Sequence, residues 1–158
     1  MTDQSLYDQL ASTAKEFMMS TSAKTQNSNE PDPERFYANL APDFRFSWGH
    51  NFFVSKTPFL QHPVDGEGFV KHQSAIAPSL ATWWIEPTKT CVDVEQRSAV
   101  LRGNFYMVAK GQSEPVVNDI IFWVEMDEEG KKVVKAMEFI DPTASAELGE
   151  RIKASKSE

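Results

Sequence analysis

The chain has 158 residues, 41% of them apolar, and its eleven Phe, four Trp and three Tyr side chains can fill one hydrophobic core. Its net charge of −7 argues against nucleic acid or an anionic membrane as a partner, because like charges repel. No run of residues reaches the roughly 18 apolar positions of a membrane span, so we expect one globular domain over residues 1–158.

The cysteine content and the first residues bear on the cellular compartment. The one cysteine, Cys91, cannot form an intramolecular disulfide, and its place in an alternating apolar run predicts a packed core thiol. The opening residues, MTDQSLYDQL, lack the basic and apolar stretches of a secretion signal. We therefore expect a cytoplasmic protein.

Helical periodicity dominates the first part of the chain. Residues 4–20 carry one apolar stripe, and the polar residues 21–31 that follow predict a mobile linker. A short second helix is expected to begin at Pro33 with Asp32 as its cap. A third helix is predicted over residues 67–77, where Pro78 ends the pattern.

Period-two alternation marks the strands. The first begins near Asp43, where Phe44, Phe46 and Trp48 alternate with smaller or polar residues. Four more strands, joined by short turns and therefore antiparallel neighbours, are predicted over residues 83–95, 98–110, 115–126 and 132–141. A small closing helix follows, and residues 154–158 are expected to form a loose tail. This order of elements predicts an α+β fold.

The strand over residues 115–126 is apolar on both faces. Because the helices can cover only one face of a meander, the other face needs a different partner. We expect a homodimer that buries the second face, made by Val117, Ile121 and Trp123.

Two stretches resemble a known superfamily. The segments FYANLAPDFRFSWG and VVNDIIFWVEMDEEGKKVVKAMEFIDP are similar to the first-strand junction and the last hairpin of the SnoaL-like branch of the nuclear transport factor 2-like superfamily. The resemblance covers most of the chain. It implies a cone-shaped, curved, mixed or antiparallel sheet, enclosing a pocket together with three helices from the N-terminal side.

The segment EFIDPTASAEL further resembles small fungal enzymes of secondary metabolism. That resemblance implies an isomerase or cyclase that rearranges a hydrophobic polycyclic metabolite without a cofactor. Two alternatives stay open, because the fold hosts many functions. One is a dehydratase of a polyketide intermediate, and the other is a non-catalytic module for ligand binding or dimerisation.

Glu138 is the leading candidate for a catalytic acid or base. Strand alternation puts it on one face with Val134, Ala136 and Ile140, where burial raises the pKa of a carboxyl and suits it to proton transfer. In the alternative, Glu138 pairs at the sheet surface with Arg102 or Lys135.

Polar residues on the neighbouring strands offer hydrogen bonds to a substrate. Arg102, Asn104 and Tyr106 share one face, which points either to the pocket or to solvent. In the pocket, Tyr106 would donate to a developing oxyanion, and Asn104 and Arg102 would bind substrate. Asn118, aligned with the apolar positions of its strand, is a second candidate catalytic donor.

The histidines complete the candidates. His50 could lie at the pocket mouth and take part in catalysis, and His72 could point inward from the third helix to bind substrate, although a structural role is open for both. In the dehydratase alternative, one of them acts with a tyrosine. Further substrate contacts are predicted from the following residues: Arg35, Tyr37, Phe46, Trp48, Trp83 and Phe122.

No motif for a metal or a cofactor is present in the sequence. The histidines, which include His62 in a loop, lack metal-ligand spacing, and the seven glycines form no phosphate-binding string. We therefore predict neither a metal nor a nucleotide cofactor.

Overall fold

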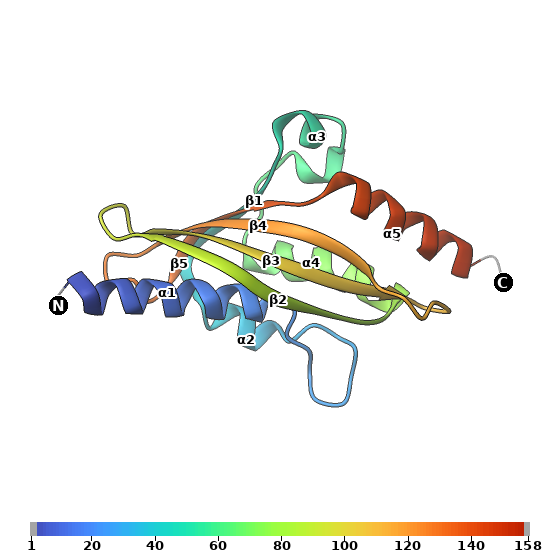
Figure 1. Ribbon diagram of the computed structural model, residues 1–158, viewed down its shortest axis with the longest axis horizontal. Helices are drawn as coiled ribbons and strands as arrows, with labels where there is room; N and C mark the ends of the chain where they lie inside the picture. The colour runs from blue at the N-terminus through green and yellow to red at the C-terminus, as the bar shows by residue number, and fades with distance from the viewer. Residues whose placement is uncertain (1–2, 157–158) are drawn as a thin grey trace.

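The computed structural model describes residues 3–156, in which one five-stranded sheet is packed with helices (Figure 1). The strands are β1 (Leu40–Gly49), β2 (Leu80–Asp93), β3 (Ser98–Ala109), β4 (Val116–Met126) and β5 (Val133–Phe139). The helices are α1 (Asp3–Ser20), α2 (Pro33–Tyr37), α3 (Asn51–Ser55), α4 (Gly66–Ile76) and α5 (Pro142–Ser155), with short 3-10 turns at Pro58–Leu60 and Ala77–Ser79.

The sheet is mixed and open. Its strand order is β1-β5-β4-β3-β2, with β1 parallel to β5 and the other pairs antiparallel. This arrangement confirms the predicted α+β class and the four-strand meander. Two parallel strands cannot be joined by a short turn. The chain between β1 and β5 holds α3, α4 and three strands, so it is long enough for these two strands to pair in parallel.

Aspartate caps decide where several helices begin. The side chain of Asp32 accepts a hydrogen bond from Arg35 N at 3.1 Å, and that of Asp65 accepts one from Gly68 N at 2.8 Å. Asp141 accepts from Thr143 N at 2.8 Å, so α5 begins at Pro142, three residues before Ser145, where the closing helix is expected from the sequence. The helix also runs through the start of the predicted loose tail, of which residues 157–158 lie outside the described residues.

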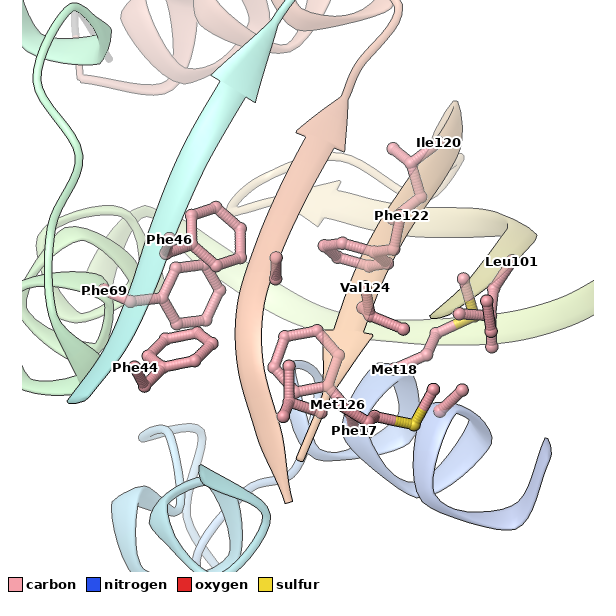
Figure 2. Packing of buried hydrophobic residues seen from close by; sticks show 14 of the residues in the cluster. Phe17, Met18, Phe44, Phe46, Phe69, Leu101, Ile120, Phe122, Val124 and Met126 are labelled. Carbon is pink, nitrogen blue, oxygen red and sulfur yellow. The ribbon is translucent and has the colours of Figure 1, made fainter. Parts of the chain in front are cut away.

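The core lies on one face of the sheet, where aromatic rings from helices and strands interlock (Figure 2). Phe17 of α1 meets Phe122 of β4 edge to face, with ring centroids 5.7 Å apart. Phe46 of β1 packs on Phe69 of α4 at 4.3 Å. These contacts fix α1 and α4 on the same face of the sheet.

The helix α5 covers the other end of this face. Ser145 of α5 is hydrogen-bonded to Asn118, which shares its side of β4 with Phe122. In Figure 1, α1 lies along one end of the curved sheet and α5 along the other, so the two described ends of the chain are far apart. The sheet between α4 and α5 is left to line a cavity.

The second face of the sheet is exposed and apolar. Trp123 is 51% exposed and Val117 43% exposed, and none of the helices within residues 3–156 covers them. We name this surface the outer face and define it by Trp84, Val100, Val117, Ile121, Trp123 and Met137. The alternation along β4 confirms the two-sided apolar pattern predicted for residues 115–126.

Cys91 is exposed near the end of the edge strand β2, which corrects the predicted core thiol, because an edge strand is packed less completely than a central one.

The segment 21–31, predicted as a mobile linker, is hydrogen-bonded to β2. Lys24 Nζ donates to Trp83 O at 2.9 Å, and Asn29 Nδ2 donates to Leu80 O at 2.7 Å. Across residues 3–156, no helix combines the length and the apolar character that crossing a membrane requires.

Candidate functional site

A cavity of about 330 Å³ lies between the sheet, α3, α4 and α5. This volume falls at the lower end of the roughly 300–1,000 Å³ typical of small-molecule pockets. The walls are mostly apolar and include Phe53, Phe69, Leu80, Trp83, Ile120 and Leu148. An apolar molecule can therefore replace water in this cavity at a gain in free energy.

Glu138 brings a carboxyl group to the cavity wall, the only one there among the described residues. Its neighbours across the sheet are Trp48 on β1 and Phe122 on β4, so its side chain shares the buried face. The indole Nε1 of Trp48 donates a hydrogen bond to Glu138 Oε2 at 3.0 Å. Desolvation by the apolar walls raises the pKa of Glu138 to about 7, and the Trp48 hydrogen bond partly opposes that rise.

The surface ion pairs that are the alternative for Glu138 do not form. Arg102 instead binds Asp119, with Nε to Oδ1 at 2.9 Å, and Lys135 binds Glu125 at 2.9 Å. Both pairs lie on the outer face. Within residues 3–156 the carboxyl of Glu138 thus has no cationic partner, and it remains able to gain or lose a proton near neutral pH.

His72 of α4 is the second titratable side chain at the cavity. Its imidazole stacks on Phe59 with centroids 5.9 Å apart and lies 5.3 Å from the Trp48 ring. Burial lowers the pKa of His72, so the ring is neutral at pH 7. A neutral imidazole offers one nitrogen that accepts a proton and one that donates a hydrogen bond.

Asn118 lines the cavity, but its amide is bonded to the protein. It is 3% exposed, its Nδ2 donates to Ser145 Oγ at 2.9 Å, and its Oδ1 accepts from Asp141 N at 2.8 Å. Both partners belong to the start of α5. Asn118 therefore fastens α5 to the sheet at the cavity wall, which differs from the substrate-donor role we expected for it.

No family model matches the sequence, and no curated protein matches it either. Solved structures match closely in fold. The BvnE pinacolase from Penicillium brevicompactum superposes with a TM-score of 0.77 and 16% identity, over 98% of this chain and 97% of that one. An NTF2-like protein of unknown function from Burkholderia pseudomallei gives 0.66 and 13% identity, over 89% of this chain and 96% of that one.

A third solved structure also has the same fold. A protein described as a putative SnoaL-like polyketide cyclase from Shewanella denitrificans superposes with a TM-score of 0.64 and 9% identity, over 89% of this chain and 96% of that one. The chain has the SnoaL-like, nuclear transport factor 2-like fold. The expected resemblance is therefore confirmed at the level of fold, and identities this low leave the reaction to be argued from the site.

Within this nuclear transport factor 2-like fold, the polar set on β3 lies outside the pocket. Tyr106 stacks on Trp84 at 4.8 Å, Asn104 lies opposite Asp119 in the sheet, and Arg102 is ion-paired there. All three point to the outer face, so their expected position in the pocket is corrected. The reason is the alternation of side chains along β3, because Gly103, Phe105 and Met107 occupy its buried side.

Other predicted site residues also lie away from the nuclear transport factor 2-like pocket. His50 is exposed and packs on Phe139 at a separate, more open depression. Arg35 is ion-paired with Glu16 at 2.9 Å, and Tyr37 is 41% exposed on α2. These three side chains lie on the rim or surface because their own elements turn them outward.

The predicted aromatic lining divides into two layers. Trp48 and Trp83 line the cavity as expected. Phe46 and Phe122 are 0% exposed and lie in the core, behind the side chains that line the cavity. Core packing thus holds the lining side chains in place.

Part of the cavity wall was absent from the sequence-based prediction. Leu148 and Ile152 of α5 close one side, and Phe59 closes another from the segment after α3. The spacing of Leu148 and Ile152 is an apolar i, i+4 pair and was a usable signal for a buried helix face. Phe59 gave no such signal, because it stands in a short Pro-containing turn.

Proposed function

We propose that this protein is a cofactor-independent isomerase or cyclase that rearranges a hydrophobic polycyclic metabolite by proton transfer. The observation that carries the proposal is the carboxyl of Glu138 in an apolar cavity that raises its pKa to about 7. A group with that pKa exists in both protonation states at neutral pH, as acid–base catalysis requires. The fold that the chain shares with a pinacolase supports a rearrangement.

The proposed chemistry divides between two side chains. Protonated Glu138 gives its proton to a carbonyl oxygen of the substrate, while neutral His72 removes a proton from the adjacent carbon. The electron pair of the broken C–H bond forms a C=C bond, and the carbonyl π pair becomes the new O–H bond. Where a C=C bond of the substrate is conjugated with the new enol, His72 returns its proton to the far carbon of that bond and the double bond shifts. The enol O–H gives its proton back to Glu138 as the carbonyl re-forms, so both side chains are restored.

The cavity walls give this chemistry its selectivity. Among the described residues no Lys or Arg lines the cavity, so a substrate carboxylate or phosphate would be buried there without a counter-ion, at high cost in free energy. Apolar walls also keep water from a charged intermediate. We therefore expect an uncharged carbon skeleton bearing one or two oxygen functions.

Product mass separates the candidate activities. The wild-type protein is incubated with uncharged polycyclic hydroxyketones and β,γ-unsaturated ketones, which rearrange without loss of water, and the products are separated and weighed by mass spectrometry. A rearrangement gives a product with the mass of the substrate, whereas dehydration gives a product lighter by one water. Binding without conversion, measured by calorimetry on the same compounds, would favour a non-catalytic module.

The dehydratase alternative keeps one supporting observation, the neutral imidazole of His72 at the cavity. The tyrosine that it was expected to use is missing from the lining side chains of residues 3–156, since Tyr37 and Tyr106 lie elsewhere. Glu138 would have to supply the acid in its place. Rearrangement is therefore the better-supported reaction.

We further propose that the outer face pairs with a second copy of the chain. Trp123 is 51% exposed on the central strand β4, and the two ion pairs Arg102–Asp119 and Lys135–Glu125 present both signs of charge on the same face. Two copies related by a twofold axis can align such a surface with itself.

Charging the outer face tests the dimer. In analytical ultracentrifugation at micromolar concentration, the wild type should sediment as a dimer and the Trp123→Glu variant as a monomer. Phe52→Glu is the matched control, because Phe52 is 78% exposed on α3, away from the sheet, and this variant should remain dimeric. A monomeric wild type would remove the proposal.

A further inference from the structure

The cavity holds a device that orients its acid. We infer that Trp48 is a positioning residue whose indole N–H fixes Oε2 of Glu138 and leaves Oε1 as the oxygen that carries and delivers the proton. This inference rests on the proposed function, and it adds which atom of the carboxyl faces the substrate and which residue makes that choice.

The geometry fixes the indole before any ligand enters. Trp48 and Glu138 are register partners on the parallel strands β1 and β5, so the backbone sets their separation. Trp48 is 6% exposed, and its ring is held edge to face by Phe46 at 5.1 Å. An indole nitrogen can donate but cannot accept a hydrogen bond. The 3.0 Å contact to Oε2 therefore has one direction in every protonation state.

The direction of this hydrogen bond decides which oxygen of the neutral acid carries the proton. In the neutral acid, the oxygen that accepts the indole hydrogen bond takes the carbonyl role, so the acidic hydrogen lies on Oε1. During transfer, the Oε1–H bond breaks, its electron pair stays on the carboxylate, and a new O–H bond forms on the substrate. The Trp48 hydrogen bond then becomes charge-assisted and stronger, so it stabilises the product side of the transfer.

The other titratable groups near Glu138 are few. From α4, His72 is the second titratable side chain that lines the cavity, and burial lowers its pKa. From β4 the register neighbour of Glu138 is Phe122, and α5 contributes Ser145, Leu148 and Ile152, none of which titrates. The Trp48 indole lies near both titratable groups, so the comparison with Glu138→Gln identifies the pH-dependent change that belongs to Glu138.

A substrate-free measurement tests the contact. In ¹H–¹⁵N spectra of the full chain recorded across pH, one of the four tryptophan indole signals should shift with a midpoint near the pKa of Glu138, about 7. That signal should disappear in Trp48→Phe, and its shift near pH 7 should vanish in Glu138→Gln. A Trp48 indole signal insensitive to pH in this range would overturn the inference.

A second variant measures the effect on the acid. Removing the donor in Trp48→Phe should raise the pKa of Glu138, followed by carboxyl ¹³C shifts, by about one unit, because the hydrogen bond favours the carboxylate. Trp83→Phe makes the same change elsewhere on the cavity wall and should leave that pKa unchanged. Equal pKa values in the two variants would contradict the positioning role.

The two proposals can fail separately. If the indole signal titrates as expected but no compound is converted, the orientation of Glu138 stands and the proposed function fails. If Trp48→Phe does not fold, the titration of the wild type against Glu138→Gln still decides. In a Trp48→Phe variant that turns substrate over, the Glu138 limb of the pH–rate profile should move upward with the measured pKa, which lost packing alone would not produce.

Discussion

Glu138→Gln should lower turnover by about 10²–10⁴-fold, the usual contribution of a positioned acid or base. Glutamine keeps the size of the side chain and can still accept the Trp48 hydrogen bond, but it cannot release a proton to the substrate. Turnover is measured on the compound that the wild type converts, with circular dichroism to confirm that the variant is folded. Near-normal turnover would exclude Glu138 as the proton donor.

The same variant should become more stable than the wild type as pH rises. The pKa of Glu138 rises from 4.5 in the unfolded chain to about 7 in the folded one, so the folded state holds the proton more tightly. The contribution of Glu138 to the free energy of unfolding is therefore complete below pH 4.5, and about 3 kcal/mol of it is lost as the pH rises through about 7. Gln does not ionise, so the variant should escape this loss.

Urea unfolding at about pH 5, 6 and 8 measures this difference. The wild-type and Glu138→Gln curves should lie close together at the lowest pH and separate as pH rises, with the variant more stable. Glu128→Gln, on the exposed turn between β4 and β5, serves as the control and should follow the wild type. Parallel curves for all three proteins would mean that the carboxyl of Glu138 reaches water in the folded state.

Asn118→Leu should cost about 2–4 kcal/mol of stability and weaken ligand binding. Leucine has similar volume but removes both hydrogen bonds to α5, leaving Asp141 N and Ser145 Oγ without their buried partner. The N-terminal turn of α5 should then leave the sheet and open the cavity. Hydrogen exchange of the first α5 amides should accelerate, while exchange in β3 stays slow.

The neighbouring strand provides a matched control for this variant. Asn104→Leu makes the same substitution on the outer face of β3, where the side chain is partly exposed, and it should change stability by about 0.5 kcal/mol or less. If both variants lose the same stability, or if the α5 amides of Asn118→Leu exchange as slowly as in the wild type, Asn118 does not fasten the helix.

Local patterns predicted most of the elements. Alternation along residues 115–126 and 132–141 defined which side chains share a face, and this pattern by itself groups Glu138 with Ala136. The caps at Asp32 and Pro33 located a helix start. The segment 51–55 was missed as a helix, because five residues with two adjacent Phe give no clear period.

The alternation of side chains along a strand does not by itself say which face of a sheet is concave. Glu138 and Tyr106 were therefore both candidates for the pocket, and only the packing of α1, α4 and α5 against one side separated them. Asn118 was assigned to the correct face, but its partners Asp141 and Ser145 come more than 20 residues later, beyond the reach of local patterns.

The sequence alone thus determined the class of fold, the order of its elements except α3, and which side chains share a face along each strand, since these depend on periods of two and 3.6 residues. The tertiary structure decided which carboxyl loses its water. A pKa near 7 arises for Glu138 because Trp48, Phe122 and the helices surround it, and these neighbours come from strands and helices far apart in the chain.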